Sequence, residues 1–187
     1  MVLDILLLLI IVGLVAFCAS EGLVRSATIL LAFYMLCMLV GMLVQAMNLA
    51  QLLGNVVIGA LGDAPRTPVF YQGLIFVLIL MPAWLIVAVI IRMSLENASI
   101  KILSWGDNVL GALVGVVLAL VVAAVICNSW GVVVSQRWPP DRVWLPLRVA
   151  FESSALKPYM MDVLLAYRRA LFPFAGPGYP IFFVPQG

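Results

Sequence analysis

The sequence predicts an all-α membrane protein, with four transmembrane helices and an amphipathic, proline-rich C-terminal tail. Hydrophobic residues make up 66% of the 187 residues and charged residues only 10%, unlike the composition of soluble domains. The charged residues also divide the chain up to residue 134 into four apolar stretches, each near the roughly 20 residues that a bilayer-spanning helix needs. We therefore expect a four-helix transmembrane domain at 1–134 and a tail outside the bilayer core at 135–187.

The expected spans run from Ile5 to Ser20, from Ala27 to Met47, from Gly73 to Ile91 and from Asn108 to Val134. Pro82 lacks a backbone N–H and should kink the third span. The first span could instead be a cleaved signal peptide, because the following FCASE supplies small residues. Asp4, with no Lys or Arg near it, argues against that alternative.

The 37 residues from Ser26 to Gly62 carry no charge, and one straight helix of that length would measure roughly 55 Å, more than a bilayer. The second half of this segment places amides on one helical face, at Gln45, Asn48, Gln51 and Asn55. We favour a helix that lies in the membrane interface. A polar wall that lines a pathway or a subunit contact is the alternative.

The tail after Val134 holds nine of the eighteen charged residues and most of the prolines. Apolar residues at helical spacing predict a short amphipathic helix from Pro158 to Phe172. Trp130, Trp138 and Trp144 lie where an interfacial aromatic belt is expected. The final FPFAGPGYPIFFVPQG is too rich in proline for regular structure and too apolar for solution, so we expect it to pack on the membrane or on a partner.

The composition argues against most kinds of chemistry. The chain has no histidine, which removes the best general base near neutral pH and the commonest zinc and haem ligand. Cys18, Cys37 and Cys127 show no metal-ligand spacing and are expected to be reduced packing residues. No charge lies in the middle of a span, so we expect no proton relay. We expect no enzymatic activity, no catalytic residues, no cofactor and no metal site.

Two further classes are disfavoured. With a net charge of +2 and no basic run, nucleic acid is not an expected partner. Ser153 and Ser154, beside Glu152 and Lys157, could suggest a Ser-Lys catalytic pair. Helix capping next to Pro158 explains these serines more simply.

The stretch WGDNVLGALVG, residues 105–115, begins the fourth span with an acid and two glycines. Ser104, three residues before Asp107, fits a capping box for the start of this helix. Beyond it, small residues recur every four positions, at Gly111, Gly115, Ala119, Ala123 and Cys127. Such a row lets another helix approach closely, and that helix could belong to this chain or to another.

Three segments together resemble the colicin V production protein family, small four-helix membrane proteins of bacteria. GDNVLGALVG is similar to the family's signature at the start of the fourth helix. DILLLLIIVGLVAFCASEGLVR is similar to its first helix and Gly-x-x-Arg loop, at Gly22 to Arg25, and ESSALKPYM to its Ser-x-Leu-x-Pro segment. The chain departs from the family at Asn108 and Leu118, where basic residues are common, and at Ser20 and Glu21 in the first loop.

The resemblance implies a place in the bacterial cytoplasmic membrane with both termini outside the cytoplasm, and a role in peptide-toxin export or in tolerance of envelope stress. Basic residues in the short loops favour the same orientation, whereas counting the whole tail reverses it. The first functional hypothesis is a non-enzymatic membrane protein that works through protein or lipid contacts, with the bilayer and a membrane-protein partner or a second copy as partners. The alternatives are an accessory subunit of a larger complex and a small pore lined by the amide face.

Overall fold

The computed structural model describes residues 2–46, 55, 68–95, 104–135, 137, 141–175 and 183. In these ranges the chain forms six helices: α1 (Val2–Glu21), α2 (Leu23–Ala46), α4 (Pro68–Ser94), α5 (Ser104–Val134), α6 (Asp141–Glu152) and α7 (Lys157–Ala175). Of these, α1, α2, α4 and α5 are long and apolar enough to cross a membrane. The predicted fold class, with four transmembrane helices, is confirmed.

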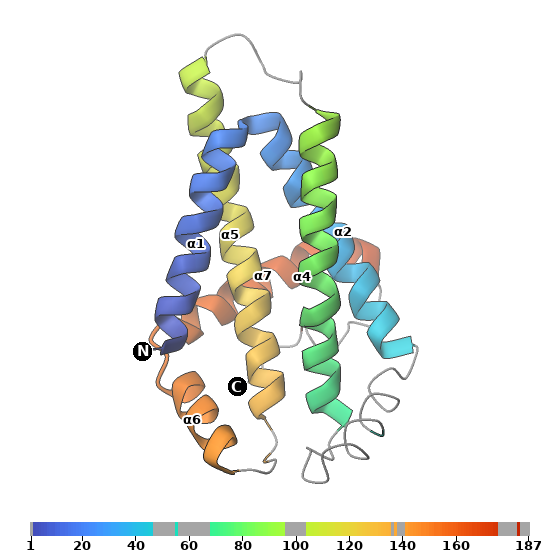
Figure 1. The fold of residues 1–187 in the computed structure, drawn as a ribbon, viewed down its shortest axis with the longest axis vertical. Helices are drawn as coiled ribbons and strands as arrows, with labels where there is room; N and C mark the ends of the chain where they lie inside the picture. The colour runs from blue at the N-terminus through green and yellow to red at the C-terminus, as the bar shows by residue number, and fades with distance from the viewer. Residues whose placement is uncertain are drawn as a thin grey trace.

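The longest helix, α5, lies at the centre of the bundle and contacts every other helix named above. Its most extensive contact is with α1 on one side, and α2 and α4 pack together on the other (Figure 1). Phe33 of α2, Phe76 of α4 and Leu118 of α5 are fully buried between these helices. Large apolar side chains such as Leu9 and Leu78 point outward and are mostly exposed, as expected for helices that face lipid.

Three of the predicted spans fall within α1, α4 and α5, and the second lies in α2 up to Ala46, with Met47 outside the described residues. Helix α4 continues through Pro82.

The predicted amide face lies mostly outside the described part of the chain. Gln45 belongs to α2, but its side chain is not described, Asn48 and Gln51 lie outside the described residues, and Asn55 is exposed. The role of the amide face stays a prediction.

The tail forms two helices where the sequence predicted one. The predicted helix from Pro158 to Phe172 corresponds to α7, which begins one residue earlier and ends at Ala175. The additional helix α6 contains Pro146 and buries Trp144 and Phe151 on one face. Burial of Trp144 removes it from the lipid-facing position that an aromatic belt requires, and Trp138 lies outside the described residues.

Polar contacts fix the start of α6 and its position against α5. Arg137 donates from Nε to Asp141 over 3.0 Å, and this hydrogen bond lowers the pKa of Asp141. Trp130 of α5 donates from its indole nitrogen to the carbonyl oxygen of Leu147, at 3.3 Å. As a result α6 lies below the end of α5, at the same end of the bundle as the start of α1 (Figure 1).

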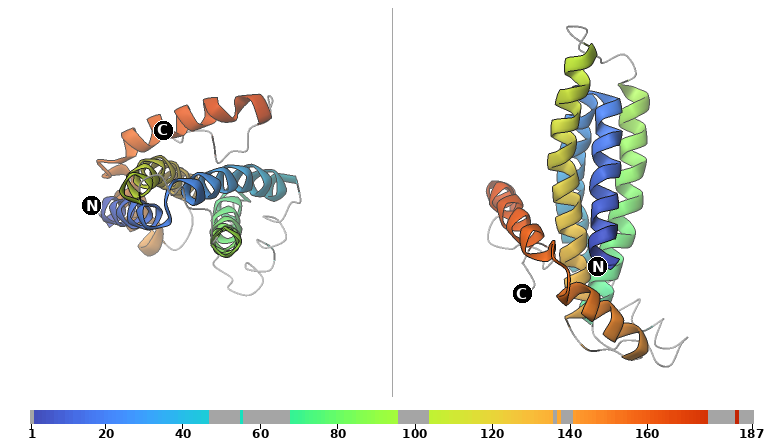
Figure 2. Two further views of the ribbon diagram at one scale, coloured as in Figure 1. Left: turned by 90° about the horizontal axis from the view of Figure 1, so that it is seen from above. Right: turned by 90° about the vertical axis from the view of Figure 1, so that its left-hand side faces the viewer.

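The second tail helix, α7, crosses the side of the bundle instead of extending away from it. Viewed from above, it runs along the side of α5 and α2, opposite to α4 (Figure 2). Met160, Leu164 and Tyr167 of α7 are buried, whereas Asp162 and Arg169 are exposed. This is the amphipathic arrangement that the spacing of the apolar residues predicts.

Candidate functional site

The turn between α1 and α2 consists of one residue, Gly22, whose φ of 80° is the left-handed conformation that glycine adopts without strain. Its N–H donates to the carbonyl oxygen of Cys18 at 3.2 Å, and its own carbonyl accepts from Ser26 at 3.1 Å. A side chain here would also collide with the carboxylate of Asp107, which lies directly against the Gly22 backbone. Two independent constraints therefore require glycine at this turn.

Asp107, near the start of α5, caps the start of α2. Its Oδ1 accepts the backbone N–H of Leu23, the first residue of α2, over 2.9 Å. The first N–H groups of a helix have no partner within it, and a carboxylate there is also favoured by the helix dipole. The Asp107 side chain thus joins α5 to the α1–α2 turn.

This contact differs from the one the sequence predicted. The capping box assigned Asp107 to the start of its own helix, together with Ser104. The hydrogen bond that the structure describes for Asp107 is made to α2 instead. The Ser104 side chain lies outside the described residues, so its part of the capping box stays a prediction.

Two glycines of α5 allow the close approach on which this cap depends. A Cβ atom added to Gly111 would lie 2.7 Å from the carbonyl oxygen of Cys18 and 3.0 Å from the Cα atom of Gly22. One added to Gly115 would lie 2.6 Å from the Cβ atom of Cys18. The helix that these two glycines meet is α1 of the same chain, and farther along the row Ala119 and Ala123 are fully buried.

A buried carboxylate at the same end, that of Glu21, joins three helices. The Glu21 side chain is only 3% exposed and accepts from Arg25 of α2 at 3.1 Å and from Arg92 of α4 at 3.2 Å. Arg25 also donates from Nε to the carbonyl oxygen of Leu95, just after α4. A buried charge is tolerated only when it is paired, and here two cations from different helices pair with it.

Sequence reasoning noted Glu21 only as a departure from the family pattern. The spacing of four residues between Glu21 and Arg25 was the available signal, because such residues are neighbours on a helix. The contact with Arg92 joins residues far apart in the sequence, and no local pattern could have indicated it.

A second polar contact, at the opposite end of the bundle, holds the tail. Asp4 of α1 accepts a hydrogen bond from the hydroxyl of Ser154 at 2.7 Å and one from the backbone N–H of Leu156 at 3.2 Å. Ser154 and Leu156 belong to the segment between α6 and α7. The start of the chain and the tail therefore lie on the same side of the bundle.

This geometry leaves no support for the Ser-Lys pair. The Ser154 hydroxyl donates a hydrogen bond to the Asp4 carboxylate. The Lys157 ammonium group lies over the Phe151 ring, 4.3 Å from its centre. Sequence reasoning had explained Ser154 by helix capping, and the structure instead places its hydroxyl on Asp4.

Farther along, the tail packs against the spans. Tyr34 of α2 donates its hydroxyl to the carbonyl oxygen of Ala170, at 2.7 Å, and its ring meets that of Tyr167 edge to face. Phe183 is fully buried and contacts the rings of Tyr167 and Phe76. Burial raises the pKa of Tyr167, so this phenol stays protonated at neutral pH.

The cysteines and acids do not form a metal site within the described part of the chain. Cys18, Cys37 and Cys127 are free and buried. No group of three or more potential metal ligands occurs among the described residues. There, the carboxylates of Asp4, Glu21 and Asp107 each contact another segment of the chain.

Comparison with known proteins identifies one family. A family model described as "Colicin V production protein" matches residues 3–164, most of the chain. No curated protein and no solved structure matches.

The close approach of α1 and α5 yields a first prediction. Gly111→Ala should destabilise the protein by about 1–3 kcal/mol, because the new methyl group would press on the backbone of Cys18 and Gly22. The matched control is Gly13→Ala in α1, where a Cβ atom has no neighbour within 4 Å. Thermal unfolding in detergent measures both variants. Equal melting temperatures for the two would contradict the close contact.

The cap yields a second prediction. Asp107→Ala should cost about 1 kcal/mol, because it leaves the Leu23 N–H without an acceptor, whereas Asp107→Asn keeps an oxygen at that position and should cost less. Thermal unfolding compares the two variants with the parent protein. If alanine and asparagine destabilise equally, the side-chain oxygen does not act as the cap.

Proposed function

This chain belongs to the colicin V production protein family, and we propose that it is a non-enzymatic, multi-pass protein of the bacterial cytoplasmic membrane. It supports peptide-toxin export or envelope homeostasis through protein or lipid contacts. The observation that carries this proposal is the docking of the tail onto the bundle by Asp4.

The docked tail presents a mixed surface at one end of the bundle. Val149 and Leu145 of α6 and Tyr159 of α7 are each more than half exposed. Exposed Asp162 and Arg169 add both signs of charge. Apolar groups beside charged ones suit contact with lipid head groups or with another membrane protein.

The orientation belongs to the same proposal. The contact between Asp4 and Ser154 places the start of the chain and the tail on one side of the bundle. We assign that side to the exterior of the cytoplasm, as the family resemblance implies. The tail surface then meets partners or lipid on the outer side of the membrane.

The two alternative functions lack a specific observation in their favour. An accessory subunit was motivated by an apolar C-terminal segment that needed a partner, but Phe183 of that segment is buried within its own chain. A pore was motivated by the amide face, of which Asn55 is the one side chain that is described. Helix α1 of the same chain packs against Gly111 and Gly115, so these glycines are not available for contact with a second copy.

Ser154→Ala and Ser153→Ala test the proposal as a matched pair. Ser154 donates to Asp4 and is buried, whereas its neighbour Ser153 is exposed. Ser154→Ala should weaken tail docking several-fold, because the Asp4 carboxylate loses its hydrogen bond from the Ser154 hydroxyl. Limited trypsin digestion after Arg168 and Arg169 measures docking. Toxin secretion and growth under envelope stress measure function in a strain that depends on this protein.

We expect Ser154→Ala to accelerate cleavage and to lower both functional readouts, and Ser153→Ala to match the parent. Asp4→Ala, which removes the shared acceptor, should have the larger effect. If the tail is released while secretion and stress tolerance stay at the parent level, contacts made by the docked tail do not carry the function.

A further inference from the structure

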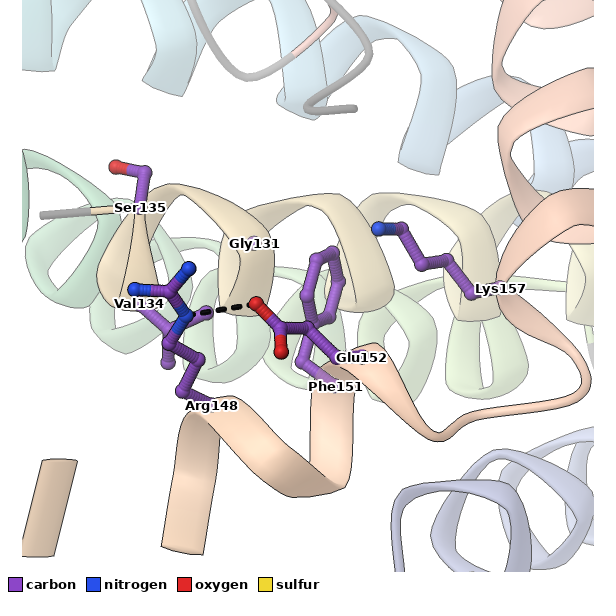
Figure 3. Close-up of a pocket in the computed structure, with 7 residues that line it drawn as sticks. All are labelled: Gly131, Val134, Ser135, Arg148, Phe151, Glu152 and Lys157. Atoms are coloured by element: carbon purple, nitrogen blue, oxygen red, sulfur yellow. Dashed lines mark hydrogen bonds and ion pairs between the residues drawn. The ribbon is translucent and has the colours of Figure 1, made fainter. Parts of the chain in front are cut away.

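A pocket of about 140 Å³ lies where the end of α5 meets α6 and the start of α7 (Figure 3). Its lining comes from three elements: Gly131, Val134 and Ser135 at the end of α5, Arg148, Phe151 and Glu152 of α6, and Lys157 of α7. The volume is enough for several water-sized groups.

Charged side chains line two sides of the pocket, Lys157 on one and the paired Glu152 and Arg148 on the other. Figure 3 shows the Lys157 ammonium group and the Glu152 carboxylate on opposite sides of the Phe151 ring. Phe151 is 4% exposed and forms an apolar floor between them. A ligand that lies across this ring meets a cation at one end and an anion at the other.

Lys157 makes a cation–π contact with Phe151, and among the described residues no ion pair is described for it. It is also the first residue of α7, where a cation is disfavoured by the helix dipole. An anionic group in the pocket would give this ammonium a charged partner.

The opposite side of the pocket is rich in acceptors. Glu152 accepts from Arg148 through Oε1 at 2.7 Å, and the pair is about half exposed. Ser135 donates its hydroxyl to the carbonyl oxygen of Val132, so its oxygen is available to accept a further bond. The C-terminal end of α5 adds partial negative charge. This side suits an ammonium group that can donate hydrogen bonds.

The length of α5 places the pocket in the head-group layer. Asp107 contacts the α1–α2 turn at one end of the bundle. Val134 follows it by 27 residues of continuous helix, or about 40 Å, close to the full thickness of a bilayer with its head groups. The pocket at Val134 is therefore level with the head groups of the opposite leaflet.

We propose that this pocket binds the phosphoethanolamine head group of a membrane phospholipid, with the phosphate at Lys157 and the ammonium group at Glu152, Ser135 and the end of α5. This inference deepens the proposed function. It rests on one part of that function, namely that the tail contacts lipid. The same zwitterionic group could come from a soluble phosphoethanolamine, and the experiment separates the two sources.

The test uses the full chain in nanodiscs of phosphatidylethanolamine, phosphatidylglycerol or phosphatidylcholine, with native mass spectrometry to count the lipids retained after mild delipidation. The parent protein should retain phosphatidylethanolamine about threefold or more over phosphatidylcholine, whose quaternary ammonium has no N–H to donate. It should also prefer phosphatidylethanolamine to phosphatidylglycerol, which has no ammonium group. Equal retention of the three lipids would overturn the proposal.

Variants locate the site. Lys157→Gln should reduce retention of phosphatidylethanolamine by about tenfold, the loss of one charge-assisted hydrogen bond, and Lys157→Arg should restore most of it. Arg169→Gln, an exposed cation of α7 outside the pocket, is the matched control and should retain lipid as the parent does. Parent-like retention by Lys157→Gln would overturn the proposal. The melting temperatures of the same samples show whether Lys157→Gln is still folded. Restored retention in Lys157→Arg shows that the charge at this position is what binds the lipid.

Two further arms give separate answers. Saturable binding of soluble phosphoethanolamine to protein in phosphatidylcholine discs, at the affinity of the lipid, would overturn the assignment to lipid. If Lys157→Gln retains lipid normally while Ser154→Ala still loses secretion, this inference fails and the proposed function stands. If Lys157→Gln loses the lipid while tail release leaves secretion intact, the proposed function fails and the pocket stands.

Discussion

The close approach of α1 and α5 is the constraint on which the rest of the bundle depends. The backbones come so near at Gly111 and Gly115 that a methyl group on either glycine would overlap α1. Only at this separation does the Asp107 carboxylate reach the Leu23 N–H across the α1–α2 turn. Because Gly22 turns the chain in a single residue, the same contact sets the direction in which α2 leaves α1.

The bundle depends on glycine contacts and hydrogen bonds because its surroundings are lipid and not water. Lipid tails are as apolar as leucine, so burying Leu or Val between helices in a bilayer gains van der Waals packing but little hydrophobic free energy. Specific contacts must then define which helices are neighbours. Glu21 does so at one end by pairing with Arg25 and Arg92, and Asp4 does so at the other by binding the tail.

Much of the fold could be predicted from the sequence, because length and apolarity alone identify bilayer-spanning helices. The spacing of Gly111 and Gly115 likewise indicated a face for close helix contact. The function of Asp107 was not predictable in this way. A capping box is a local pattern, whereas the observed partner of Asp107 is a backbone group of another helix.

The tail illustrates the same limit. The sequence predicted one tail helix, from Pro158 to Phe172. Trp144 and Phe151 can both be buried when their segment is helical, and α6 forms as a second tail helix. Ser154 and Lys157 are close in sequence, and helix capping was the preferred explanation of the serine. Their actual partners, Asp4 and the Phe151 ring, are determined by how the tail folds back on the bundle.

The most direct test of this account is residue-resolved hydrogen exchange at the Leu23 amide, in the parent protein and in Asp107→Ala. If α5 caps α2 across the close contact, the Leu23 N–H should be protected in the parent and should exchange much faster in the variant, while amides in the middle of α2 stay protected. Equal exchange at Leu23 in the two proteins would contradict the claim that Asp107 joins α5 to the α1–α2 turn.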